Sequence, residues 1–247
     1  MNHNSFILSP VCQTLEDAIS ASIGIGGGIE TYPLCDYVMQ SVFLKMTGSQ
    51  EQKMKCICWE LATNDYEYRY LRFTRQQLGE CSNYTDKNNI YKDLMKKIEN
   101  HTLTFYKINE SDREKILSET SLSIEKVFSG SNLLTWSQKS FYEYSDIWAS
   151  VTYEHFAVDE KNLFFHKKGA YLLKEMYENH LYKHRNRVAH NTQSYQQNLP
   201  TLKTLESESY RYDNYFIYFA ILILIDNIFI DIYSRYLETL EEVGQYS

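Results

Sequence analysis

One stretch of the chain, Lys161 to His190, concentrates the side chains that phosphate chemistry needs. It holds seven lysines and arginines against two glutamates, a local balance of +5 that leaves −12 for the remainder. Four of the seven histidines also lie in it. Arginine binds phosphate oxygens through two parallel hydrogen bonds, and histidine transfers protons near neutral pH. The stretch therefore indicates a localised phosphate site, with a solvated helical face as the alternative reading of the same composition.

Three other patterns that carry chemistry elsewhere are weaker here. The glycines from Gly24 to Gly28 lack a Gly-Lys-Ser/Thr ending, and Ile29 stands where a dinucleotide motif has its third glycine, so they predict a flexible loop. Cys56 and Cys58 have no second Cys or His pair at zinc-site spacing and are expected to be buried thiols. No Gly-x-Ser-x-Gly segment indicates a serine hydrolase.

The basic stretch ends in the six residues Arg185-Asn186-Arg187-Val188-Ala189-His190. This order resembles the Arg-Asn-x-x-x-His form of the signature motif of the HEPN superfamily, the helical ribonucleases of toxins, anti-phage effectors and CRISPR nucleases. In that family the motif lies near the end of the third core helix of an antiparallel helical bundle. Here it likewise ends an amphipathic helix and precedes a polar loop and an apolar final helix. The architectural resemblance spans residues 111–242.

The resemblance implies an endoribonuclease that needs no metal and no other cofactor. The 2′-OH of RNA is the nucleophile, so cleavage requires proton transfer and positive charge on the phosphate, and it leaves a 2′,3′-cyclic phosphate and a 5′-hydroxyl. His190 is expected to transfer protons, Arg185 to hold the phosphate charge, and Asn186 to orient a phosphate oxygen or the histidine. The residues expected to contact the RNA backbone are Lys167, Lys168, Lys183, His184 and Arg187.

Helical geometry bears on how this motif could work. Positions five apart on a regular helix differ by about 140° in azimuth, so Arg185 and His190 do not share one face. They converge if the helix frays near His190 or if two motifs meet across a twofold axis. The resemblance implies the second arrangement, a homodimer with the site at its interface. A toxin or defence effector would also have an inhibitor or sensor protein as partner.

Two functions of other classes remain open at this point. The first is a non-catalytic helical dimer that binds RNA or nucleotide, or that serves as an adaptor for another protein. The second is a plain helical interaction module in which the motif occurs by chance. Burial of the His190 side chain inside a monomer would favour the second.

The elements that must position the motif are predicted to be helices. The strongest pattern covers Gly169 to His190, with Leu173, Tyr177, Leu181 and Val188 on one side. A polar loop from Asn191 to Pro200 follows, and then an almost uniformly apolar helix from about Asp213 to Leu240. Further helices are expected over 15–22, 35–45, 49–61, from 86, over 111–128 and within 133–156. Residues 66–78 could form a helix or a strand, and we favour the helix. Capping-box spacings predict two helix starts, at Ser49 with Gln52 and at Ser111 with Glu114.

Composition agrees with an all-α fold, which we expect to be an antiparallel helical bundle with an additional N-terminal helical region. Three prolines and nine glycines leave the 247 residues nearly free of helix breakers. A weak boundary near residues 101–110 would separate an N-terminal region, 1–105, from the HEPN-like bundle, 106–247. No internal repeat or low-complexity tract divides the chain further.

Charge and hydropathy restrict the class of protein. A net charge of −7 argues against nonspecific coating of nucleic acid. Five cysteines, an odd number, and the lack of a signal-peptide pattern favour free thiols and a cytoplasmic location. The longest apolar run, Tyr215 to Ile225, would span only about 16 Å as a helix against the roughly 30 Å of a bilayer core, so we expect a core helix and no membrane contact. Asp226 and Asp231 on this helix are expected to make structural hydrogen bonds or ion pairs.

Overall fold

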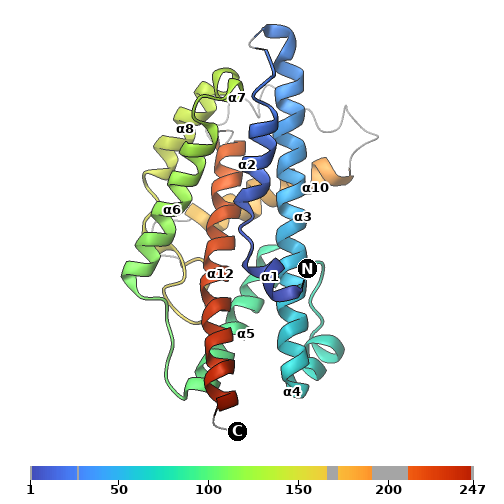
Figure 1. Cartoon of the computed structure of the whole chain (residues 1–247), viewed down its shortest axis with the longest axis vertical. Helices are drawn as coiled ribbons and strands as arrows, with labels where there is room; N and C mark the ends of the chain where they lie inside the picture. Colours follow the sequence, from blue (N-terminus) through green and yellow to red (C-terminus); the bar gives the residue numbers. More distant parts are fainter. Residues whose placement is uncertain (1, 27, 166–171, 191–210, 246–247) are drawn as a thin grey trace.

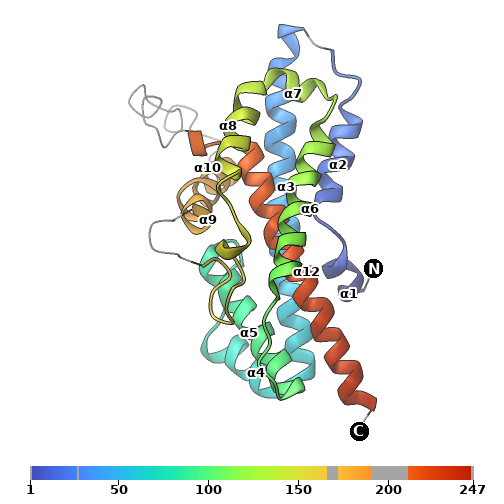
Figure 2. The ribbon, with the colours of Figure 1, turned by 90° about the vertical axis from the view of Figure 1, so that its left-hand side faces the viewer.

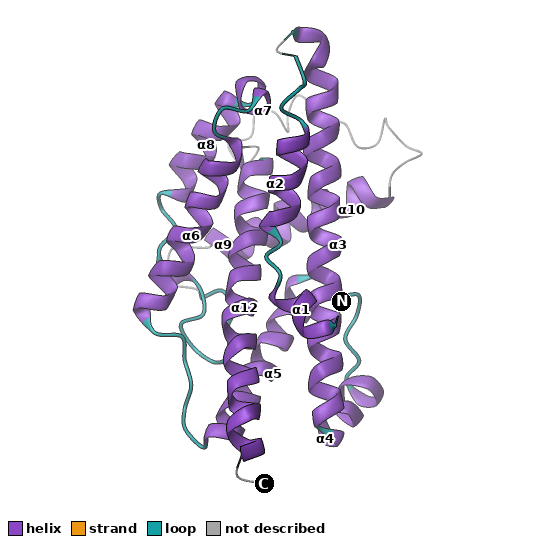
Figure 3. Ribbon diagram, in the orientation of Figure 1, coloured by secondary structure: helices purple, strands orange, loops and turns teal. Residues whose placement is uncertain are grey.

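The computed structural model describes residues 2–26, 28–165, 172–190 and 211–245 (Figure 1). Within these ranges the protein consists of helices joined by loops and turns and contains no strand (Figure 3). One isolated bridge joins Phe156 to Phe164 in the loop after the eighth helix. The predicted all-α fold is therefore confirmed.

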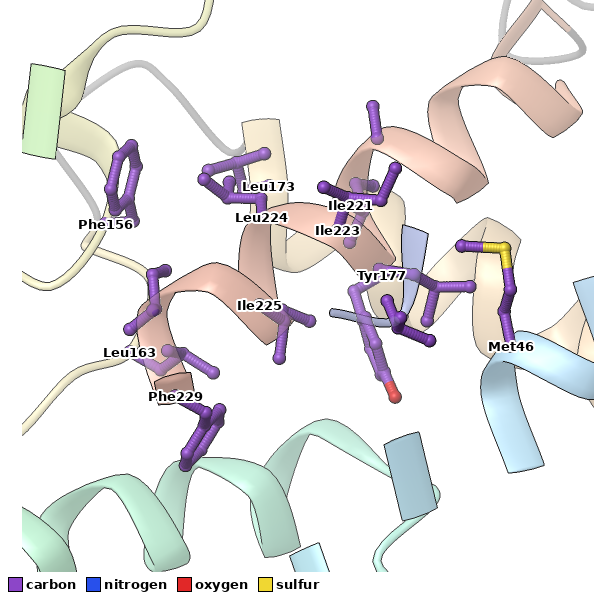
Figure 4. Packing of buried hydrophobic residues seen from close by; sticks show 14 of the residues in the cluster. Met46, Phe156, Leu163, Leu173, Tyr177, Ile221, Ile223, Leu224, Ile225 and Phe229 are labelled. Atoms are coloured by element: carbon purple, nitrogen blue, oxygen red, sulfur yellow. The ribbon is translucent and has the colours of Figure 1, made fainter. Parts of the chain in front are cut away.

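Helix α12 (Tyr215–Gln245) is the central element of the bundle. Its first half is apolar on every face, the pattern of a helix surrounded by protein, and every residue from Phe216 to Ile225 is buried. It packs against α3 (Tyr32–Asn64), α5 (Tyr84–Thr102), α6 (Glu110–Phe128) and α8 (Gln138–Trp148), and also against α1 (His3–Leu8) and the π-helical turn η4 (Met176–Leu181). Figure 4 shows four of its aliphatic side chains, Ile221, Ile223, Leu224 and Ile225, in this core.

The segment Tyr215–Glu242 is long and apolar enough to cross a membrane by length and composition alone, and its most apolar 18-residue window is 78% buried inside the protein. This burial fits the core helix that we predicted from the sequence.

The long helices do not all run the same way. α6 runs opposite to α12, whereas α3 runs in the same direction as α12 (Figures 1 and 2). One hydrophobic core extends from Ile7 near the N-terminus to Tyr236 on α12. The predicted boundary at 101–110 lies between α5 and α6, which both pack on α12, so the predicted regions 1–105 and 106–247 share this core.

Helix α3 corrects one of the predictions. Its 33 residues form one helix where the sequence predicted two, 35–45 and 49–61, with a new start at Ser49. Gly48 therefore lies inside a helix, which costs about 1 kcal/mol relative to alanine. Tertiary packing overrides this local cost, because Met46, Gln50 and Met54 are fully buried on the face toward α12. Gln50 also donates a hydrogen bond of 2.9 Å from Nε2 to the carbonyl oxygen of Leu222.

The starts of α5 and α6 lie one or two residues before the predicted ones. Asn83 and Asn109 cap these helices, each accepting a 2.8 Å hydrogen bond from the backbone N–H three residues later. The capping box predicted at Ser111 with Glu114 is therefore wrong, because α6 has already begun at Glu110. The other helices are α1 (His3–Leu8), α2 (Cys12–Ala21), α4 (Tyr66–Tyr70), α7 (Asn132–Trp136), the π-helical turn η2 (Leu71–Arg75) and two 3₁₀ turns, η1 (Ile29–Thr31) and η3 (Tyr153–His155).

A buried ion pair ties α12 to the N-terminal part of the chain. The Lys53 Nζ lies 2.6 Å from Asp226 Oδ1, and both side chains are at most 2% exposed. The backbone N–H of Val11 donates to Asp226 Oδ2 at 2.7 Å, and Lys53 also donates to the carbonyl oxygen of Ser9. Burial raises the pKa of the Asp226 carboxyl, and the Lys53 ammonium opposes that shift. Asp226 thus makes both an ion pair and a hydrogen bond, the contacts expected of it, and its structural role stays a prediction. For Asp231, burial and the nearby charge of Asp112 raise the pKa, and its role stays a prediction.

The C-terminal end of α5 gives a first testable prediction. Leu103 caps this helix in the left-handed conformation, with φ of 53°, and its side chain is 89% exposed. Replacement by glycine removes the Cβ clash of that conformation, so Leu103→Gly is expected to raise the free energy of unfolding by about 0.5–1 kcal/mol. Urea unfolding measures this, with Leu103→Ala as the control that keeps the Cβ. Equal stability of the two variants would refute the assignment.

Candidate functional site

The candidate site lies on one helical segment, residues 172–190, which we call the motif helix. It comprises α9 (Leu172–Glu175), a π-helical turn η4 (Met176–Leu181) and α10 (Tyr182–His190), which follow one another without a break. The motif helix crosses behind α12 and α3 in Figure 1 and lies on the flank of the bundle in Figure 2. Its η4 turn packs on α12, and α10 packs on α3.

The buried side of the motif helix agrees in part with the predicted stripe. Leu173, Tyr177 and Leu181 are buried, and Figure 4 shows Leu173 and Tyr177 beside the aliphatic residues of α12. Val188 is only half-buried, contrary to the prediction. Val188 follows Leu181 by seven residues of α-helix and so lies near the same azimuth, but it is close to the end of the motif helix, which lies at the edge of the bundle (Figure 1).

Arg185 makes the principal contact of the motif. Its Nη2 lies 3.0 Å from both carboxylate oxygens of Glu51 on α3, and the two side chains are 19% and 11% exposed. Its Nη1 donates to Asn186 Oδ1 at 3.2 Å. The guanidinium is therefore held in a fixed orientation at the protein surface by a carboxylate and an amide. The sequence did not indicate Glu51, which is 134 residues away along the chain.

Arg185 lies in a closely packed region together with Gln50, Glu51 and Lys87, with no room for a further group. Lys87 is 1% exposed and donates from Nζ to the carbonyl oxygen of Cys81 at 2.9 Å. Burial lowers the pKa of its ammonium to about 8, and the carboxylate of Glu51 opposes that shift. The Oε1 of Gln50 is buried and has no hydrogen-bond partner among the described residues. Sequence reasoning missed Lys87, since a lysine on an amphipathic helix is normally solvated.

An open depression of about 740 Å³ lies on the outer side of Arg185. It is lined by Glu80, Ser82, Tyr182, Lys183, Arg185, Asn186 and Arg187. Glu80, its only carboxylate among the described residues, pairs with Lys55. Four predicted site residues, Lys183, Arg185, Asn186 and Arg187, thus share one surface hollow. The arrangement can hold a phosphate group among the cations of Lys183, Arg185 and Arg187.

His184 lies apart from this depression, in an aromatic cluster. Its ring lies within 5.4 Å, centroid to centroid, of the rings of Phe43, Tyr215 and Tyr218, and its Nε2 is 3.0 Å from the Tyr215 hydroxyl. Burial, together with the nearby charge of Arg187, lowers the pKa of this imidazole to about 4. The predicted contact of His184 with RNA is not supported by this placement, because the ring packs among aromatic side chains and does not line the depression.

The enclosed imidazole leads to a prediction on pH. Since the folded pKa of His184 is about 4 and the unfolded value is about 6.5, the unfolded chain binds more protons between these values. This stabilising contribution is complete above pH 6.5 and is lost as the pH falls toward 4. The free energy of unfolding should fall by about 2 kcal/mol more between pH 7 and pH 5 in the parent protein than in His184→Gln. His3→Gln, at an exposed histidine, is the control, and an equal loss in all three proteins would contradict the assignment.

The structure describes the remaining predicted site residues only in part. His190 is the last described residue of α10, and its backbone is helical. The side chain of His190, Lys167, Lys168 and the predicted loop 191–200 lie outside what the structure describes. In the described residues no group of three or more His, Cys, Asp or Glu side chains could hold a metal ion. Cys35, Cys58 and Cys81 are buried free thiols, whereas Cys12 and Cys56 are half-buried ones.

Comparisons of the chain with protein-family models, curated proteins and solved structures find no match. The interpretation of the site therefore rests on its own residues and their geometry.

Proposed function

We propose that the protein is a metal-independent endoribonuclease of the HEPN type. The observation that carries the proposal is the depression at the end of the motif helix, where Arg185 and Asn186 of the motif lie together with Lys183 and Arg187. A phosphodiester seated there meets fixed positive charge, and the motif histidine follows on the same helix, one turn further along. In this proposal α6, α8, the motif helix and α12 form the HEPN-like core.

The chemistry follows from the residue types. The 2′-OH of the substrate attacks the adjacent phosphorus after losing its proton, and the 5′ oxygen of the next nucleotide leaves with a proton. Arg185 stabilises the charge that develops on the phosphoryl oxygens, because its planar fork stays charged at every relevant pH. His190 transfers the protons, and Asn186 holds the guanidinium or a phosphate oxygen in place. The Glu51 carboxylate orients Arg185 before the substrate binds.

A dimer supplies the geometry that one copy of the helix lacks. α10 is α-helical from Tyr182 through His190, so the backbone does not fray before the histidine. Arg185 and His190 of one copy therefore point about 140° apart. Two motif helices that meet across a twofold axis bring the Arg185 of one copy near the His190 of the other. This is why we propose a homodimer, with Lys167 and Lys168 as further contacts to the RNA.

A second candidate, an adaptor without catalytic activity, has one observation in its favour. The Arg185 guanidinium already has a carboxylate partner at 3.0 Å, so a purely structural role would account for its retention. The two candidates differ in cleavage and not in assembly, because both use a helical dimer. The cellular roles that fit the first are a toxin or an anti-phage effector in the cytoplasm, controlled by an inhibitor or sensor protein.

Two measurements test the proposed reaction: whether cleavage needs a metal ion, and which chemical groups stand at the ends of the RNA products. The purified protein is expected to cleave a defined single-stranded RNA equally well with and without EDTA and to leave 2′,3′-cyclic phosphate and 5′-hydroxyl ends. A substrate with 2′-deoxy sugar at the cleaved position should be resistant, since it lacks the nucleophile. Cleavage that disappears with chelator, or a 5′-phosphate product, would overturn the mechanism.

A further inference from the structure

A second surface of the protein combines exposed aromatic rings with arginines. Helix α4 and the π-helical turn η2 together cover residues 66–75, which we call the aromatic–arginine segment. It packs against the end of α3 through Tyr68, which is buried. Its other aromatic side chains face solvent: Tyr66 is 72% exposed, and Tyr70 and Phe73 are each 46% exposed.

The arginines of this segment are stacked on its rings. The Cζ of Arg69 lies 5.3 Å from the ring centroid of Tyr66, and that of Arg75 lies 5.6 Å from the centroid of Tyr70. Arg75 also donates from Nε to the Tyr70 hydroxyl at 3.1 Å. These contacts hold each charge beside an open aromatic face before any ligand arrives.

Arg72, the third arginine, has a different task. It donates from Nε and Nη2 to the two carboxylate oxygens of Asp93 on α5, at 2.7 and 2.8 Å. Both side chains are less than 15% exposed. This bidentate pair anchors the segment to the bundle, so the exposed rings and arginines stand on a fixed base.

The charge of the segment favours a polyanion. Residues 66–75 contain three arginines and one glutamate in a chain whose net charge is −7. Because Arg72 is paired with Asp93, the segment presents Arg69 and Arg75 against Glu67 to the solvent. Bases stack on exposed aromatic rings whatever their sequence, and arginines beside the rings reach the flanking phosphates. A duplex keeps its bases inside, so rings of this kind suit a single strand.

The segment also leads toward the depression of the candidate site. From Arg75 the chain continues to Glu80 and Ser82, which line that depression. Seven residues span at most about 25 Å. Lys55 pairs with Glu80 one helical turn along α3 from Glu51, the partner of Arg185. One strand of moderate length can therefore touch both surfaces.

We propose that the aromatic–arginine segment binds single-stranded RNA and delivers it to the depression at the motif helix. Tyr70 and Phe73 stack on bases, and Arg69 and Arg75 hold the adjoining phosphates. The choice of RNA as the ligand rests on the proposed function, whereas binding itself does not require cleavage.

The test measures binding in a protein that cannot cleave. His190→Ala is the parent, and the probe is a fluorescent 12-nucleotide oligouridine in an anisotropy titration. Replacing Tyr70 and Phe73 together by alanine is expected to weaken binding about 30-fold or more, because each of the two stacked bases contributes about 1–3 kcal/mol. Tyr142→Ala, at a tyrosine that is 72% exposed on α8, is the matched control and should bind as the parent does.

A second pair of variants tests the charges. Replacing Arg69 and Arg75 by glutamine should reduce the salt slope of log affinity by about 1.4, since each single-strand phosphate contact contributes about 0.7. Arg235→Gln, at an arginine paired with Glu238 on α12, is the control. Circular dichroism confirms that each variant is folded.

The outcomes separate the two proposals. Absence of saturable binding by the parent, or equal affinity of the ring variants and Tyr142→Ala, overturns the role of the segment. A change of oligomeric state in the ring variants with unchanged affinity would mean that a second copy covers this surface. If the unmutated protein fails to cleave RNA while the ring variants lose binding, the proposed ribonuclease fails and the RNA-binding surface stands.

Discussion

Replacing Arg185 by alanine is expected to reduce RNA cleavage by about 10²–10³-fold. A fixed donor to a transition-state oxyanion typically contributes about 3–4 kcal/mol, and Arg185 supplies both the charge and two directed N–H groups. Arg185→Lys should restore little, because an ammonium group cannot form the planar fork. The measurement is the single-turnover rate on a defined RNA with EDTA present. Arg235→Ala, at a surface arginine on α12, is the control for the loss of one positive charge.

A second variant is needed to distinguish a loss of catalysis by Arg185→Ala from a loss of stability. Truncation of Arg185 leaves the Glu51 carboxylate, 11% exposed, without the partner that it has at 3.0 Å. The double variant Arg185→Ala with Glu51→Gln removes both charges and should unfold near the parent midpoint. If the double variant is stable and inactive, Arg185 acts on the substrate. If it is stable and fully active, Arg185 is structural and the proposed role of Arg185 in cleavage is wrong.

The same assay tests the histidine. His190→Ala should lower the rate by about 10²–10⁴-fold, the usual contribution of proton transfer, while leaving dimer formation unchanged. His3→Ala, at an exposed histidine near the N-terminus, should retain the parent rate. Mixing inactive Arg185→Ala with inactive His190→Ala should restore part of the activity if each site takes one residue from each copy. Full activity of His190→Ala would remove the HEPN-type mechanism.

The largest effect on stability is expected at the buried ion pair of α12. Asp226→Ala leaves the Lys53 ammonium, 2% exposed, without its carboxylate and also removes the acceptor of the Val11 N–H. Breaking a buried pair from one side costs about 3–5 kcal/mol. Urea unfolding should report a loss of that size. The paired replacement Lys53→Met with Asp226→Leu should recover most of it, because neither charge then remains buried.

An assay of RNA cleavage checks whether the Lys53–Asp226 ion pair serves structure alone. Asp226→Asn keeps the acceptor for Val11 and should show intermediate stability with the parent rate of cleavage. A loss of cleavage by Asp226→Asn at unchanged unfolding midpoint would place Asp226 in the chemistry and contradict the structural role.

The sequence predicted features that depend on neighbouring residues, and it missed features that depend on contacts between residues far apart in the chain. The apolar run of α12 and the spacing of Leu173, Tyr177 and Leu181 are local patterns, and both lie in helices with those faces buried. The continuity of α3 through Gly48 depends on contacts with α12, which no local pattern contains. Asn109 caps α6 in place of the predicted Ser111, because asparagine is at least as good a cap as serine and lies two residues earlier.

The candidate site shows the same limit. The sequence grouped Lys183, Arg185, Asn186 and Arg187 because they are neighbours on one helix, and they line one depression. It could not supply Glu51 or Lys87, whose proximity to Arg185 depends on how three helices pack. It also assigned His184 to the RNA surface, since charge composition does not tell which side of a helix meets aromatic rings from α3 and α12.

The π-helical turn η4 gives the motif helix one place where its length can change. A π-helical turn is an α-helical turn that holds one residue more, so a deletion of one residue within Met176–Leu181 would convert it to regular α-helix. Because the turn itself remains, the residues after the deletion would keep nearly the same azimuth relative to the part anchored on α12, and Arg185 would stay on the side of Glu51. A deletion of one residue at the start of α10 would instead rotate everything after it by about 100° and separate Arg185 from Glu51. Natural variants of this chain should therefore tolerate the loss of one residue in η4 far better than the loss of one residue in α10.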